Sequence, residues 1–102
     1  MINPLIFNIM KAKAIEKEQI KYVVFPKEDV LTDSYDKHLR RHLVERARIL
    51  GNTEKHKVNI YFDSVEGTHV VSTTIWDVDN DFVTLKCATV LPIRAIRQVS
   101  LG

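Results

Sequence analysis

The sequence predicts an α+β fold in which N-terminal helices precede a small antiparallel β-barrel of four to five strands. Apolar residues recur at helical spacing before Gly51 and alternate after it. The 102 residues suit one modest core, and 45% hydrophobic with 27% charged residues is typical of a globular chain. We therefore expect a single domain over residues 1–102, helical over 1–52 and a small β-barrel over 53–102.

Two helices are predicted in the first half. Asn3 and Pro4 are a typical N-cap and first helical residue, and the apolar stripe that follows predicts a helix extending to Lys21. A short apolar run, residues 22–25, ends at Pro26 and predicts an edge strand or buried extended segment.

The clearest helix is predicted over Thr32–Leu50. Asp33 or Ser34 can cap its start, and Gly51 with Asn52 is a typical left-handed ending. One apolar face is expected to pack on the barrel, formed by Tyr35, Leu39, Leu43, Ala47 and Leu50.

From His56 onward the pattern is that of strands. A first hairpin is predicted around the turn 63–67, with a long second strand over 68–77 and a third over 82–87. Pro92 can begin a strand or a single 3₁₀ turn, but it cannot lie in a central ladder. The alternation makes Cys87 a small core residue, and the expected inward set is Val58, Ile60, Phe62, Ile75, Val83 and Leu85.

Residues 56–101 resemble a known class of small barrels. The segments VNIYFDSVEG, WDVDNDFVTLK and LPIRAIRQV are similar to SH3-like and Sm-like barrels, in particular those of short uncharacterised bacterial proteins. Sm-like resemblance implies oligomeric rings and RNA binding. However, Ala95 stands where a glycine would follow the arginine, and the hairpin tip lacks Met-Asn, so the resemblance transfers no RNA-binding residue.

Two groups of side chains could be interpreted as metal sites. Asp77, Asp79 and Asp81 match the start of a calcium loop, but Phe82 and Ala88 stand where that loop needs its glycine and its glutamate. Asp and Asn suit a tight hairpin turn instead.

His38 and His42 are four residues apart on the predicted helix. They lack a third ligand at a telling spacing and have cationic neighbours. We predict neither a metal site nor a cofactor, and metal-dependent hydrolysis at these histidines is the most distant hypothesis.

Charge is unevenly distributed, with ten basic and seven acidic residues before residue 53 and five and six after it. A basic stripe on the helix can neutralise phosphates, which makes nucleic-acid (RNA) binding the alternative function. An ordinary solvated face, with the arginines paired to nearby carboxylates, is the competing interpretation. The residues assigned to this alternative are Lys37, Arg40, Arg41, Arg48, Arg94 and Arg97.

The leading interpretation is a non-enzymatic binding or assembly module. No nucleophile motif or phosphate-binding glycine loop is present. Trp76 and Tyr61 are expected on the outward faces of their strands, where aromatic residues mark a contact surface, although Trp76 can also pack under the helix. We expect a homo-oligomer or a protein partner.

The expected location is the cytoplasm. The single cysteine excludes an intramolecular disulfide, and no apolar run approaches the roughly 18 residues of a membrane-spanning helix. The apolar opening lacks a basic leader and a cleavage site, so a signal peptide and a membrane partner are not expected.

Overall fold

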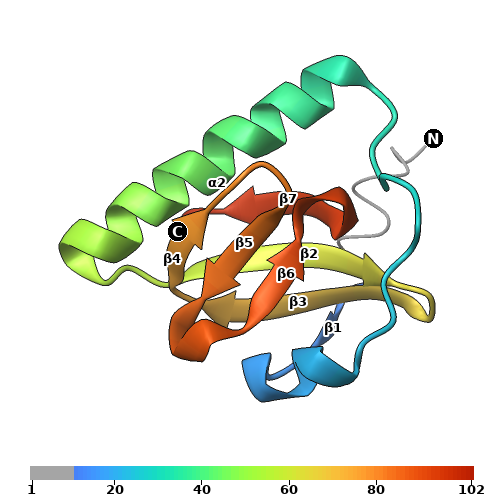
Figure 1. The fold of residues 1–102 in the computed structure, drawn as a ribbon, viewed down its shortest axis with the longest axis horizontal. Coiled ribbons are helices and arrows are strands. Elements are labelled where there is room, and N and C mark those ends of the chain that lie inside the picture. The colour runs from blue at the N-terminus through green and yellow to red at the C-terminus, as the bar shows by residue number, and fades with distance from the viewer. Residues whose placement is uncertain (1–10) are drawn as a thin grey trace.

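The computed structural model describes residues 11–102 and has an α+β architecture (Figure 1). One long helix lies across two small sheets, and short 3₁₀ helices join several strands. In chain order the elements are β1 (Lys13–Ala14), η1 (Lys17–Tyr22), α2 (Ser34–Glu54), β2 (Val58–Ser64), β3 (Gly67–Thr73), β4 (Ile75–Val78), β5 (Phe82–Leu85), η2 (Lys86–Ala88), β6 (Val90–Pro92), η3 (Ile93–Ala95) and β7 (Ile96–Ser100).

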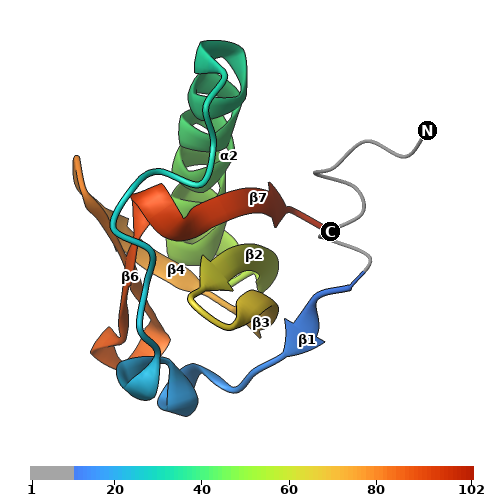
Figure 2. The same cartoon turned by 90° about the vertical axis from the view of Figure 1, so that its right-hand side faces the viewer.

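The strands form two sheets, so the predicted closed barrel is wrong. One sheet has the order β1-β3-β2-β7 and the other β4-β5-β6 (Figures 1 and 2). The chain crosses between them at Thr74 and again through η3. Both crossings interrupt a ladder: Thr74 lies between β3 and β4, and Pro92, which has no N–H to donate, ends β6.

The predicted core is confirmed. Each of the six residues expected to point inward is at most 2% exposed. In the register of the first hairpin, Ile60 lies opposite Val71 on β3 and opposite Val99 on β7, so one face of three strands supplies apolar side chains to the same interior. From the second sheet, Ile75, Val83 and Leu85 complete this core.

Helix α2 is confirmed, but the apolar face predicted for it is only partly right, because Ala47 is buried and Leu43 packs against the core whereas Tyr35 and Leu39 are exposed. The Asp33 side chain accepts hydrogen bonds from the backbone N–H groups of Tyr35 and Asp36, which caps the start. The face against the sheets is Arg40, Val44, Ala47 and Gly51. Tyr35 is 72% exposed and Leu39 44% exposed.

Close contact between helix and sheet explains this choice of face. A Cβ on Gly51 would lie 2.4 Å from the carbonyl oxygen of Ile75, so only glycine permits this approach. Gly51 is therefore inside the helix and not its predicted ending. The left-handed residue that ends α2 is Lys55, at φ 55°.

The predicted first helix is wrong within the described residues, and its proposed start at Asn3 lies outside them. Instead, Lys13 and Ala14 pair in parallel with β3, and η1 follows. Ile20 is the buried residue of η1, and Ile15 before it packs partly buried against the core, so this segment contacts the core through separate apolar side chains and not through a helical stripe. Across residues 11–102, α2 is therefore the only α-helix.

Cys87 is exposed, contrary to its predicted place in the core. Strand β5 ends at Leu85, and the chain then turns through left-handed backbone at Cys87 (φ 68°) and Ala88 (φ 63°). The alternation of the strand therefore stops before it reaches the thiol.

No helix within residues 11–102 combines the length and the apolar character needed to cross a bilayer.

Candidate binding surface

A cavity of about 610 Å³ lies where the N-terminal half of α2 faces the β4–β5 turn and η3. Segments far apart in the sequence build its wall. The lining residues are Asp29, Lys37, His38, Arg40, Arg41, Asn80, Asp81, Phe82, Ile93 and Arg94.

Arg40 connects the loop before α2 to the helix and to β7. Its Nη1 donates to Asp29 Oδ1 at 2.9 Å and to the carbonyl of Ile96 at 3.0 Å, and its Nη2 donates to Asp29 Oδ2 at 2.7 Å. Arg40 is 6% exposed. Its Nε is buried without a hydrogen-bond partner among the described residues. The guanidinium group of Arg40 therefore serves to connect the segments of the cavity wall.

Asp29 stays ionised through this contact. Burial raises the pKa of Asp29, but hydrogen bonds from Arg40 and from the backbone N–H of Leu31, with the charges of Arg40 and Lys37, outweigh burial and hold the pKa below its ordinary value of 3.8. The charges of Asp29 and Arg40 therefore offset each other within the wall.

Arg41 holds the turn between β4 and β5. Its Nη1 donates to the carbonyl of Asp79 and its Nη2 to that of Asn80, both at 2.9 Å. The Asp79 side chain accepts from the backbone N–H groups of Asp81 and Phe82, each at 2.8 Å, and these bonds lower the pKa of Asp79. This is the predicted hairpin turn.

No metal-ligand cluster occurs in the part of the chain that the structure describes, counting groups of three or more His, Cys, Asp or Glu side chains. His38 lines the cavity, whereas His42 does not.

The six basic residues assigned to nucleic-acid binding separate into two groups. Lys37, Arg40, Arg41 and Arg94 line the cavity. The other two are paired elsewhere with carboxylates. Arg48 Nε lies 3.2 Å from Glu45 Oε2, and Arg97 Nη2 lies 2.7 Å from Asp63 Oδ2. The basic stripe is thus partly the solvated, paired face that was its competing interpretation.

Trp76 and Tyr61 lie on different sheets. Trp76 is on β4 and is 46% exposed, so α2 does not bury it. Tyr61 is on β2, opposite Val70 on β3, and is only partly exposed. The two aromatic residues do not share a sheet face, so they do not form one contact surface.

Two exposed apolar residues on the same sheet as Trp76 were missed by the sequence analysis. Phe82 is 41% exposed and Val90 is 46% exposed. The register pairs Thr84 with Val90 and Phe82 with Pro92, so the residues next to the buried Val83 and Leu85 share the outer face of the β4–β5–β6 sheet. The alternation around Val83 contained this signal, because it places Phe82 on the opposite face.

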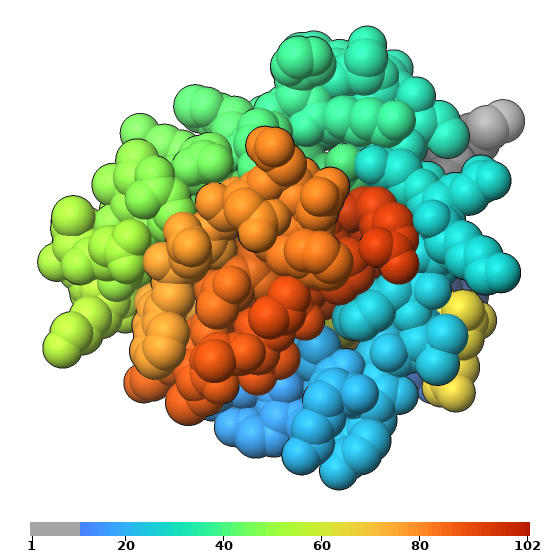
Figure 3. Space-filling view, viewed as in Figure 1, coloured from blue at the N-terminus to red at the C-terminus, as the bar shows by residue number. Residues whose placement is uncertain are grey.

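Trp76 points away from the fully buried Ile75, as strand alternation requires, and the irregular pairing between Ile75 and Asp77 leaves Asp77 exposed as well. We call Trp76, Phe82 and Val90 the outer apolar patch. Figure 3 shows the surface of this sheet at the front of the molecule, with α2 above it. Phe82 also lines the cavity, so the outer apolar patch and the cavity are contiguous.

Comparison with known proteins found no matching family profile, no similar curated protein and no similar solved structure.

Proposed function

We propose that this protein is a non-enzymatic binding module that contacts a protein partner, or a second copy of itself, through the outer apolar patch. One observation carries the proposal: three large apolar side chains on one small sheet are each more than 40% exposed. Aromatic residues are enriched at the centres of protein interfaces, where burying them on association is favourable.

The local structure supports a preformed contact surface. Val83, Leu85 and Leu91 anchor the inner face of the same sheet and are each 0% exposed. The outer side chains therefore project from a sheet that the core holds in place, so little ordering of the backbone is needed on binding.

The test is the solution mass of the purified protein together with the proteins that co-purify from lysate. Trp76→Ala should abolish self-association or capture of the partner, because truncating an aromatic side chain at the centre of an interface typically costs about 2 kcal/mol or more. Tyr35→Ala is the matched control, since Tyr35 is exposed on α2 and outside the patch. A wild-type protein that is monomeric and captures nothing would overturn the proposal.

Nucleic-acid binding is the second candidate function, and the cavity is the observation that favours it. Lys37, Arg41 and Arg94 come from two separate segments and line the same cavity beside the exposed ring of Phe82. Cations beside an exposed aromatic ring are the features that bind single strands.

This second candidate is tested with a labelled single-stranded oligouridylate at several salt concentrations. Affinity should fall steeply with added salt, and replacing Lys37 and Arg94 by alanine should reduce that dependence. The paired residues provide the control, since Arg48→Ala removes a charge outside the cavity. Binding that does not depend on salt would contradict this function.

A further inference from the structure

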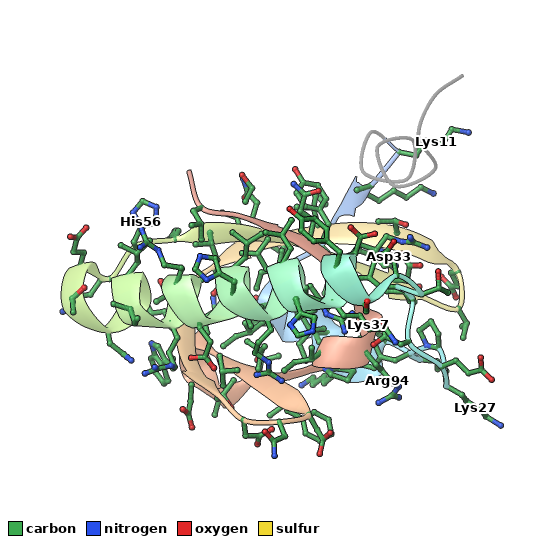
Figure 4. The ribbon with its side chains drawn as sticks, turned by 90° about the horizontal axis from the view of Figure 1, so that it is seen from above. Lys11, Lys27, Asp33, Lys37, His56 and Arg94 are labelled. Carbon is green, nitrogen blue, oxygen red and sulfur yellow. The ribbon has the colours of Figure 1, made fainter. Side chains whose placement is uncertain are left out.

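The cavity combines cations that keep free donors with an Arg40–Asp29 ion pair in its wall, whose charges already offset each other. Lys37 and Arg94 lie on the same side of α2 near its N-terminal end (Figure 4), and both line the cavity. Within residues 11–102, the only hydrogen bond of the Arg94 side chain runs from Nε to the carbonyl of Pro26, at 2.8 Å. Both terminal nitrogens of Arg94 are therefore left to donate.

Arg41 also retains donors. Each of its terminal nitrogens makes one hydrogen bond to the turn, and each carries two N–H groups, so one N–H on each remains. Its ion pair with Glu45 is long, at 3.7 Å. Lys37 has no hydrogen bond or ion pair through its ammonium group in the described part of the chain, although its charge acts on Asp29.

The charges that line the cavity leave a positive excess. Arg40 and Asp29 offset each other at 2.7 Å. Lys37, Arg41 and Arg94 then face a single remaining carboxylate in the lining, that of Asp81. A dianion can meet all three cations, whereas a neutral ligand would leave them uncompensated.

We propose that this cavity binds a phosphate monoester, with the phosphate held by Lys37, Arg41 and Arg94. Guanidinium and ammonium groups together form the donor set that proteins use for phosphate. The volume of about 610 Å³ exceeds the size of a phosphate and leaves room for its organic group against Phe82. The inference rests on the second candidate function, because the same cations serve both, but it adds the chemical group and its location.

The phosphate can come from a free phosphorylated small molecule or from the end of a nucleic acid strand. Calorimetric titration of the full chain distinguishes these sources with five probes: inorganic phosphate, adenosine 5′-monophosphate, adenosine, an oligouridylate with a 5′-phosphate and the same oligouridylate without it. The monophosphate should bind at least about tenfold more tightly than adenosine, because charge-assisted hydrogen bonds to phosphate are lost with the nucleoside.

Substitutions of the lining residues test whether the monophosphate binds in the cavity. Lys37→Ala combined with Arg94→Ala should weaken monophosphate binding by about tenfold or more. Lys86→Ala removes an exposed lysine that does not line the cavity and should leave binding unchanged.

A third variant is expected to bind the monophosphate more tightly, a result that misfolding would not produce. Asp81→Asn removes the opposing carboxylate and should strengthen monophosphate binding by about threefold to tenfold. The Asp81 side chain makes no hydrogen bond within residues 11–102, and its structural contacts run through its backbone N–H and carbonyl.

The outcomes separate the two ideas. Equal binding of adenosine and its monophosphate, or no binding of any phosphate probe, overturns the phosphate site. If the oligouridylate binds in a salt-dependent way with or without its 5′-phosphate, if the Lys37 and Arg94 variants weaken that binding, and if neither inorganic phosphate nor the monophosphate binds, the nucleic-acid function stands and the phosphate site fails. If only small phosphate probes bind, the site stands and the nucleic-acid function fails.

Discussion

The two halves of helix α2 are attached to the sheets by different physical means. In the C-terminal half, Ala47 is fully buried and Gly51 lies close to the backbone of β4, so the contact depends on shape. In the N-terminal half, Arg40 and Arg41 reach a loop, a strand and a turn through hydrogen bonds. Shape-dependent packing fixes the position of the helix, and the polar half leaves room for a charged cavity.

The largest effect should come from the apolar half. Gly51→Ala places a Cβ 2.4 Å from the carbonyl oxygen of Ile75 and 2.9 Å from Thr74 Cγ2, so helix and strand must separate. We expect a loss of about 3 kcal/mol or more in the free energy of unfolding, measured by urea denaturation. In an uncrowded helix the same change would stabilise by up to about 1 kcal/mol.

Asn52→Ala, at the exposed neighbouring position, is the matched control and should stay within about 0.5 kcal/mol of the wild-type protein. A Gly51→Ala variant as stable as this control would show that α2 does not need its close approach to β4.

Breaking the polar half at its buried arginine should have the next largest effect. Arg40→Met removes the bonds to Asp29 and to the carbonyl of Ile96, and leaves the Asp29 carboxylate without its cation. We expect a loss of about 2 to 3 kcal/mol, less than for a fully buried pair because water reaches Asp29. Denaturation of Arg40→Met, Asp29→Asn and the double variant measures the coupling. Additive losses would show that the two side chains do not stabilise each other.

This contrast also explains what could be predicted from the sequence. Alternation identified the inner set from Val58 to Leu85, because a strand with one buried face must repeat every second residue. The Asp33 cap and the Asp79 turn were predictable because each uses backbone groups within three residues.

The cavity and the face of α2 could not be predicted in the same way. Arg40 can be buried because it pairs with Asp29, which lies eleven residues earlier in a loop. No periodic pattern in the sequence predicts such a pair. The rotation of the helix follows from space beside Gly51, which depends on the course of β4. Arg94 meets Lys37 only after the chain has passed through both sheets.

Acid should weaken the polar half and spare the apolar half. The folded-state pKa of Asp29 lies below its ordinary value of 3.8, so its stabilising contribution is present above that value and is lost as the pH falls through the folded-state pKa. Urea denaturation between roughly pH 5 and pH 2 should show a smaller loss for Asp29→Asn than for the wild type. Glu54→Gln, at the other end of α2, should follow the wild type. Parallel curves for Asp29→Asn and the wild type would remove Asp29 from the acid response.

The smallest effect is expected where Arg41 meets the β4–β5 turn. Arg41→Lys keeps the charge, but an ammonium group cannot reproduce the two-pronged contact with the carbonyls of Asp79 and Asn80, so we expect a loss of about 0.5 to 1 kcal/mol. The informative measurement is amide hydrogen exchange. The N–H groups of Asp81 and Phe82 are held by the Asp79 side chain, and they should exchange faster once the helix no longer holds the turn. Arg46→Lys, on the exposed face of α2, provides the control. Equal exchange in the two variants would mean that the turn holds its shape alone, and that Arg41 is free to serve the cavity.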